Sequence, residues 1–372
     1  MKRRDFAIGL GAALGAAPAL ALTRRPPGDS NPPDWATGPG RGDFSSARSA
    51  WAGAAEAKSP LGQTDALLVV QDGKLVFERY GEQCGPAVRH VSWSMAKSIT
   101  HALVGIAVAE GKVDIDRPLK TIPRADPKLT LRSLITLTDG LEWKEGDYSP
   151  ANSDAARMLY GPGRFDCAAF AGDRAQAHPP GTRWNYSTGA FVLAAAELQA
   201  NLFPEAHAPG ARRAAMASWI DAKLFKPLGM TSALAEFDAA GTFAGGSLVY
   251  ANARDFARFG ELYRLDGVWR GRRILPPGWV KFARAPTVQP IYGAGFWLEA
   301  KATNDPPSLM AGAGPMDAFS AEGHNGQVIL IVPSKSLVLV RLGLMDDGDA
   351  AWKTLGAWIT PIVSALPDTK AA

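Results

Sequence analysis

Hydrophobic and polar residues follow two different periods along the chain, and strand-like runs occur near both ends. Residues 66–71 and 74–81 are two runs rich in β-branched and aromatic residues, separated by Asp72-Gly73. This combination predicts a β-hairpin, because Asp-Gly accepts the positive φ angles of a tight turn. Residues 326–344 form another such run, which Pro-Ser-Lys-Ser interrupts at 333–336. That interruption predicts two further strands joined by a turn.

Between these strands the apolar residues recur at helical spacing. Residues 94–111 and 254–265 are examples, and residues 349–366 predict a final amphipathic helix. We therefore expect a mixed α+β fold in which an antiparallel β-sheet is flanked by helices. N- and C-terminal segments build the sheet, and a mainly helical domain is inserted between them.

The expected domain boundaries follow from this pattern. Residues 45–111 and 291–372 are assigned to the sheet domain, and residues 112–290 to the helical insert, which we expect to supply the walls of the substrate pocket. Residues 22–44 are rich in Pro, Gly and charge without periodicity, which is typical of a linker.

The first 21 residues have the plan of an export signal. A basic start precedes a short Ala/Gly/Leu segment that ends in Ala19-Leu20-Ala21. Arg3-Arg4-Asp5-Phe6 resembles the twin-arginine signal of bacteria. We expect cleavage after Ala21 and a periplasmic or secreted protein, with a disordered or membrane-anchoring N-terminus as the alternative. No apolar run beyond the signal reaches the length of a transmembrane helix.

Composition limits the possible functions. The 372 residues carry a net charge of only +4, part of it in the signal, so nucleic acid is not an expected partner. The two cysteines, Cys84 and Cys167, are too few for a disulfide framework and could be paired or free. The five histidines are scattered and no His-Glu-x-x-His occurs, so we expect neither a metal nor a cofactor.

The first candidate site is Ser94-x-x-Lys97 at the start of the helix expected from 94. Side chains at i and i+3 share one helix face, so the two groups should be neighbours. Free N–H groups at a helix start favour developing negative charge, and a desolvated lysine can lower its pKa and assist proton transfer. The alternative is an ordinary N-capping serine followed by a surface lysine.

Two further elements carry candidate chemistry. Tyr186 lies between a Pro-Gly loop and a helix, where its phenol could project into a cleft and interact with an ammonium group. His324-Asn325-Gly326 stands before the strand of residues 327–332, and Gly326 would allow a close approach of substrate to the backbone. A surface role is the alternative for His324.

The order of these three elements resembles the serine β-lactamase and penicillin-binding-protein superfamily. The likeness is greatest to its class C branch and to the members that resemble 6-aminohexanoate-dimer hydrolase. Segments 131–146, 226–233, 250–280 and 322–343 share it.

The resemblance implies roles for particular residues. Ser94 would attack the carbonyl, with Lys97 supporting its deprotonation and Tyr186 acting as general base and then acid. The backbone N–H groups of Ser94 and Gln327 would form the oxyanion hole, and His324, Asn325 and Gly326 would bind substrate.

Two departures bear on the substrate. Thr188 stands where class C β-lactamases have Asn, and His324-Asn325-Gly326 where they have Lys-Thr-Gly. A mostly neutral imidazole thus replaces an ammonium, which argues against efficient lactam hydrolysis. We expect a serine hydrolase that cleaves a small ester or amide. A β-lactamase or D,D-peptidase is the alternative enzyme, and a non-catalytic penicillin- or peptidoglycan-binding module the alternative from another class. The sequence does not indicate an oligomeric state.

Overall fold

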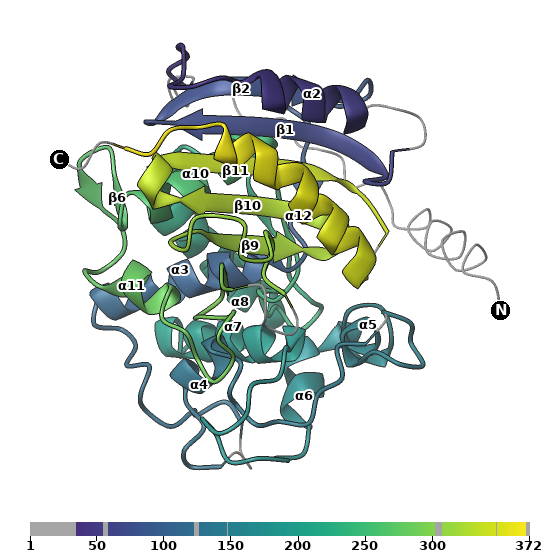
Figure 1. Cartoon of the computed structure of the whole chain (residues 1–372). Coiled ribbons are helices and arrows are strands. Elements are labelled where there is room, and N and C mark those ends of the chain that lie inside the picture. Colours follow the sequence, from purple (N-terminus) through teal and green to yellow (C-terminus); the bar gives the residue numbers. More distant parts are fainter. Residues whose placement is uncertain are drawn as a thin grey trace. The chain divides into compact units, whose positions relative to one another are not determined.

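A six-stranded antiparallel sheet forms the centre of the structure, in the order β2-β1-β11-β10-β9-β8 (Figure 1). The computed structural model describes residues 35–54, 59–122, 126–146, 148–301, 307–346 and 348–369. The strands of the sheet are β1 (Gln63–Gln71), β2 (Lys74–Tyr80), β8 (Trp297–Leu298), β9 (Phe319–Gly323), β10 (Gln327–Val332) and β11 (Leu337–Leu344).

The sheet joins the two ends of the sequence as expected. β1 and β2 form the hairpin predicted at Asp72-Gly73, where both residues have positive φ. β10 and β11 form the second pair, turning at Pro333–Lys335, and β11 lies directly beside β1. The expected fold class is therefore confirmed in this part of the chain.

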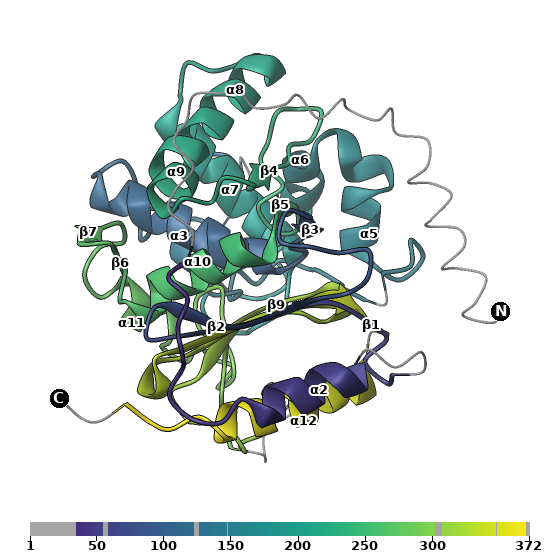
Figure 2. The same cartoon turned by 90° about the horizontal axis from the view of Figure 1, so that it is seen from above.

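Helices cover both faces of the sheet, as Figure 2 shows. α2 (Ser45–Ala54) and α12 (Asp349–Ser364) lie on one face, where their apolar residues meet Leu67, Leu330 and Leu339 of the sheet. α3 (Met95–Ala109) and α10 (Ala253–Arg264) lie on the other face within a larger hydrophobic core. Burial of this apolar area on both faces is the main term that holds the layers together.

The segment between β2 and β8 is mainly helical. Its remaining helices are α4 (Leu131–Ile135), α5 (Asp154–Leu159), α6 (Cys167–Gly172), α7 (Thr188–Leu202), α8 (Pro209–Ile220), α9 (Lys226–Leu228) and α11 (Trp279–Ala283). Short strands complete it: β3 (His90–Val91), β5 (Val249–Ala251) and β4 (Leu234–Ala235) form one small sheet, and β6 (Val268–Trp269) and β7 (Arg272–Arg273) another. The proposed limits of the helical insert stay a prediction.

Part of the segment interpreted as a linker lies against the sheet. Trp35 is buried and donates a hydrogen bond from Nε1 to the Arg254 carbonyl at 3.3 Å. Ala36 accepts a backbone bond from Leu75 on β2. Arg41 forms an ion pair with Asp72 at 2.7 Å. Low sequence periodicity did not indicate this packing, because one tryptophan and a few hydrogen bonds leave no periodic pattern.

The expected signal, residues 1–21, lies outside the described residues. Among the residues that the structure describes, no helix is both long enough and apolar enough to cross a bilayer.

Candidate active site

Ser94 begins helix α3 in a tightly held turn. Ser92 makes two hydrogen bonds with Val249 of β5. Its hydroxyl accepts the Val249 N–H at 3.0 Å, and its backbone N–H donates to the Val249 carbonyl at 2.7 Å. Trp93 has a positive φ of 45°, which is unusual for a bulky residue and marks a constrained backbone. The β5 contacts therefore fix the turn that places Ser94 at the helix N-terminus.

Lys97 lies one turn later and is almost completely buried, with 1% of its side chain exposed. Its Nζ is within hydrogen-bond distance of Ser94 Oγ at 2.8 Å, Thr188 Oγ1 at 2.9 Å and the Gly246 carbonyl at 2.9 Å. Burial lowers the pKa of Lys97 to about 8, while the Glu145 carboxylate acts in the opposite direction. The alternative of a capping serine and a surface lysine is wrong, because Ser94 makes no side-chain cap bond.

Glu145 connects to this pair through Thr188. Its carboxylate accepts the Thr188 hydroxyl, the Thr188 N–H at 2.9 Å and the Trp143 indole N–H at 2.6 Å. Thr188 is the first residue of α7, so the carboxylate also lies at a helix N-terminus, where negative charge is favourable. Sequence reasoning missed Glu145, and its only signal was its place in the segment 131–146 that resembles the family.

Tyr186 enters the site just before α7. Its ring lies with its centroid 4.8 Å from Lys97 Nζ and stacks on Trp297 at 5.4 Å between centroids. Trp184 and Tyr292 complete an aromatic cluster around it. The structure thus brings Tyr186 beside Ser94 and Lys97, which lie about 90 residues earlier in the sequence.

A cavity of about 630 Å³ opens beside Ser94. Tyr148, Tyr186 and His324 line it, together with residues 307–311 and part of α12. Glu299 holds the 307–313 segment by accepting the Ser308 hydroxyl at 2.7 Å and the Gly312 N–H at 2.6 Å. The expectation that the helical insert supplies the walls is only partly correct, since the C-terminal helix forms much of one side.

The His-Asn-Gly triplet follows strand β9, which the sequence interpretation did not anticipate. His324 lines the cavity, and its ring lies 4.5 Å from the Tyr148 ring and 5.5 Å from that of Trp93. Asn325 instead donates to the Met345 carbonyl at 2.9 Å. A side chain at Gly326 would meet Arg341 and Met345. Of the three residues, only His324 is among those that line the cavity.

Gln327 occupies a buried position at the start of β10. Its side chain bonds both backbone groups of Gly343, donating to the carbonyl at 2.5 Å and accepting the N–H at 3.1 Å. Gln327 is paired with Gly323 in the β9–β10 ladder and is not among the residues that line the cavity. The structure therefore does not bring Gln327 beside Ser94 at the cavity wall.

Gly323, the last residue of β9, lies close to the nucleophile turn. A Cβ atom on Gly323 would lie 2.3 Å from the Ser92 carbonyl oxygen and 3.2 Å from the Trp93 Cβ. Only glycine permits this approach. The next residue, His324, consequently lies where the strand end meets the cavity and Ser94.

A second acidic residue that sequence reasoning missed lies on β9. Glu322 lines the cavity and accepts the Ser320 hydroxyl at 2.6 Å. Burial of the carboxyl, with Glu299 nearby, raises the pKa of Glu322 to about 7. The sequence did not indicate Glu322, because residues 319–323 lack the long apolar run that would have predicted a strand there.

Both cysteines are free thiols. Cys84 is half-buried and Cys167 is buried in α6. The possible disulfide between them is not formed.

Comparisons with known proteins find similarity over most of the chain. The sequence model of the family described as Beta-lactamase matches residues 61–343. The 6-aminohexanoate-dimer hydrolase of Paenarthrobacter ureafaciens is 24% identical over 321 residues, covering 82% of this chain and 79% of that protein.

Solved structures show the same fold. A D-stereospecific amidohydrolase from Streptomyces sp. matches with a TM-score of 0.57 at 17% identity, covering 84% of this chain and 98% of that one. A penicillin-binding protein homologue from Caulobacter crescentus gives a TM-score of 0.61 at 16% identity, covering 87% and 99%. These likenesses confirm a β-lactamase/transpeptidase-like fold.

Proposed function

Because the chain belongs to the beta-lactamase family of serine hydrolases, we propose that it cleaves an amide or ester bond through an acyl-enzyme on Ser94. The resemblance stated from the motifs is thereby confirmed at the level of the family, and so is the assignment as an enzyme. The observation that carries the finer proposal is the 2.8 Å contact between Ser94 Oγ and the buried Lys97 Nζ.

The hydrogen bonds around Lys97 favour it as the first proton acceptor. The Gly246 carbonyl can only accept, and Thr188 Oγ1 accepts from Lys97 because its own hydrogen is donated to Glu145. A neutral amine with two hydrogens directed at these acceptors leaves its lone pair for the Ser94 hydroxyl. A pKa of about 8 makes the neutral form accessible near neutral pH.

Tyr186 is then assigned the proton transfer to the leaving group. Its ring is next to both Lys97 and the cavity, so its phenol can pass a proton from the amine toward a leaving nitrogen or oxygen. This assignment moves the acylation base from Tyr186, where the resemblance placed it, to Lys97.

The oxyanion hole is assigned to the backbone N–H groups of Ser94 and His324. The resemblance gave the second donor as Gln327, the residue after the triplet His324-Asn325-Gly326. The triplet whose glycine approaches the nucleophile turn is Ala321-Glu322-Gly323, and His324 follows it. Donors at this place would stabilise negative charge on the carbonyl oxygen as it develops.

The substrate proposed is a small amide or ester without a carboxylate near the reacting carbonyl. The relatives named for hydrolysis of a 6-aminohexanoate dimer and for D-stereospecific amide hydrolysis support amide cleavage. Glu322 and His324 line the cavity next to Ser94, and Lys353, a cation that also lines it, is an exposed side chain on α12. A partly ionised Glu322 would repel the carboxylate of penicillins and cephalosporins.

Export remains part of the proposal. The basic start, the short apolar segment and Ala19-Leu20-Ala21 support a periplasmic or secreted enzyme. Fractionation of cells that express the tagged chain, with Arg3 and Arg4 replaced by lysine as the control, tests it. Retention of the unchanged chain in the cytoplasm would contradict export.

The test of function combines covalent labelling with a substrate panel. A fluorophosphonate should label Ser94, and Ser94→Ala should lose both the label and turnover. The wild type should hydrolyse a short-chain nitrophenyl ester and a simple amide with higher kcat/KM than a chromogenic cephalosporin or a D-alanyl dipeptide. Faster turnover of the cephalosporin or dipeptide would establish the lactamase or peptidase alternative, and labelling without any turnover the binding module.

A further inference from the structure

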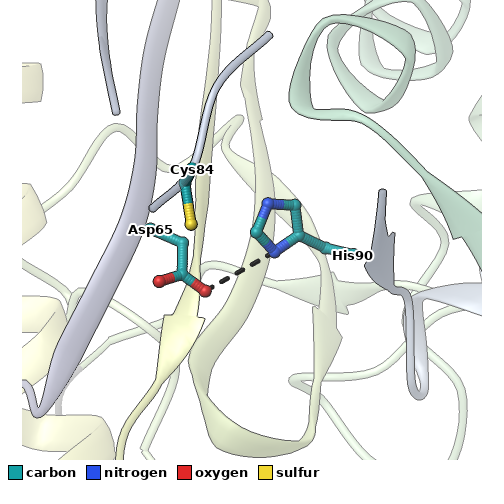
Figure 3. Close-up of side chains that lie close together, drawn as sticks. All are labelled: Asp65, Cys84 and His90. Atoms are coloured by element: carbon teal, nitrogen blue, oxygen red, sulfur yellow. Dashed lines mark ion pairs between the residues drawn. The ribbon is translucent and has the colours of Figure 1, made fainter. Parts of the chain in front are cut away.

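Three side chains from separate segments meet where strand β3 leads into the nucleophile turn (Figure 3). Asp65 lies on β1, His90 on β3, and Cys84 in the 81–89 loop between β2 and β3. His90 Nδ1 is 3.5 Å from Asp65 Oδ2. One ligand atom from each residue lies within 4.8 Å of those of the other two.

The polar atoms of this cluster are incompletely satisfied. His90 Nε2 is buried and has no hydrogen-bond partner among the described residues. An imidazole nitrogen is the commonest metal ligand among side chains. Unpaired buried polar atoms are uncommon in folded proteins and call for a physical explanation.

We propose that Asp65, Cys84 and His90 bind one divalent transition-metal ion, with zinc the best match. Thiolate sulfur, imidazole nitrogen and carboxylate oxygen are the ligands that Zn²⁺ takes in proteins, whereas Mg²⁺ and Ca²⁺ prefer oxygen alone. A tetrahedral ion with bonds of about 2.0–2.3 Å requires ligand atoms about 3.3–3.8 Å apart. The His90–Asp65 distance of 3.5 Å is already in this range, and Cys84 Sγ lies within 4.8 Å of the other two ligand atoms.

The charges around the cluster permit a cation. Arg341 is buried nearby and interacts with Asp65, but its guanidinium is held by the Leu61 and Gln63 carbonyls at 3.0 Å each. Binding would release the Cys84 thiol proton and so add a negative charge to the site. The ion would then face one thiolate, one carboxylate and one neutral imidazole, and water can fill a fourth position.

A cysteine nucleophile is the competing use of these residues. The Asp65 carboxylate and burial raise the pKa of Cys84 to about 11, which opposes formation of the thiolate that a nucleophile needs. A bound cation reverses this preference, because it stabilises the thiolate directly. The same environment that disfavours a reactive thiol is therefore compatible with a metal ligand.

The bound ion would stabilise the fold and would not take part in the reaction. The ion would tie β1 and the 81–89 loop to His90, four residues before Ser94 in the chain. It would thereby stabilise the segment that ends in the nucleophile turn. Zinc bound in this way should raise the thermal midpoint by a few degrees, because a ligand that binds only the folded state stabilises it.

The experiment titrates the full-length protein, reduced and freed of metal with a chelator, with Co²⁺ and then Zn²⁺. We expect one equivalent of Co²⁺ to produce a thiolate-to-cobalt band in the near ultraviolet, and Zn²⁺ to displace it. Cys84→Ser should abolish the band, whereas Cys167→Ser, the matched control in α6, should retain it. Asp65→Asn and His90→Asn should weaken binding at least tenfold.

A second measurement needs no variant. Zn²⁺ should protect Cys84 of the wild type from alkylation, read by peptide mass spectrometry, while the low reactivity of buried Cys167 stays the same. Absence of a cobalt band in the wild type, survival of the band in Cys84→Ser, or equal alkylation of Cys84 with and without Zn²⁺ would each overturn the proposal.

Discussion

Two polar clusters flank the short segment from His90 to Lys97, and they differ in how completely their groups are paired. Lys97 has acceptors for all three of its possible hydrogens, and Thr188 continues the chain of bonds to Glu145. In the other cluster Asp65 accepts a hydrogen bond from Gln63 at 2.6 Å, but the His90–Asp65 ion pair is 3.5 Å long and His90 Nε2 has no partner among the described residues. A closed network is ready for proton transfer, whereas an open one is suited to receive a ligand.

A second contrast lies within helix α3. His101 is buried one turn after Lys97, with Nδ1 2.7 Å from the Tyr263 hydroxyl, and burial lowers the pKa of His101 to about 3. Lys97 is equally buried, but Glu145 counteracts the desolvation and keeps its pKa near 8. Burial lowers the pKa of both bases, but the amine starts from an ordinary value of 10.5 and the imidazole from 6.5, so Lys97, with Glu145 partly opposing the shift, still titrates near working pH while His101 stays neutral.

The largest expected effect is on kcat, and it should distinguish the Lys97 cluster from the His90 cluster. Lys97→Ala should lower kcat for ester hydrolysis by roughly 10²–10⁴-fold, the scale of a lost general base. His90→Asn should change kcat less than threefold but lower the thermal midpoint measured with Zn²⁺. Lys112→Ala, at an exposed lysine, serves as the control for loss of a lysine. A large loss of kcat in His90→Asn would place both clusters in the reaction.

The next effect tests whether the catalytic groups act as a unit. Tyr186→Phe should lower kcat by roughly 10²-fold, with Tyr160→Phe, at an exposed tyrosine, as the control. The double variant of Lys97 and Tyr186 should lose far less than the product of the single losses, because both serve one proton path. Strictly multiplicative losses in kcat would show that the two residues act independently.

The pH profile tests the influence of Glu145 on Lys97. In the proposed mechanism the neutral amine of Lys97 accepts the proton, so kcat/KM should rise with pH and level off above the Lys97 pKa of about 8. Because the Glu145 carboxylate raises that pKa, Glu145→Gln should move the rising limb to lower pH. Glu142→Gln, an exposed neighbour, should leave it in place. If kcat/KM of Glu145→Gln rose over the same pH range as that of the wild type, Glu145 would not raise the Lys97 pKa.

The smallest effect concerns substrate charge. Glu322→Gln removes a carboxyl whose pKa is about 7, so at pH 8 it removes a negative charge from the cavity wall. The KM of a cephalosporin should fall a few-fold, while the KM of an uncharged nitrophenyl ester should hardly change. Glu82→Gln, at the exposed loop, is the control. Equal changes for both substrates would assign Glu322 a packing role instead.

The sequence alone determined the fold class and the three central residues. Alternating runs at both ends, the Asp-Gly turn and the helical spacing between them are local patterns, and local patterns report local structure. The contact between Ser94 and Lys97 was predictable for the same reason, since residues three apart on a helix share a face, whereas their assignment as a site rested on the resemblance to the family. Tyr186 was identified through its motif and the order of motifs along the chain.

The tertiary structure decided the partners of those residues. Glu145 is linked to Lys97 through Thr188, because the loop before α5 folds back on the start of α7. No sequence spacing encodes the Glu145–Thr188 hydrogen bonds. We propose His324 in place of Gln327 as the second oxyanion donor because strand β9, which has no clear sequence pattern, approaches the nucleophile turn at Gly323. Asp65, Cys84 and His90 are scattered in sequence and meet only when β1 and β3 come together, since long-range contacts depend on packing rather than on local propensity.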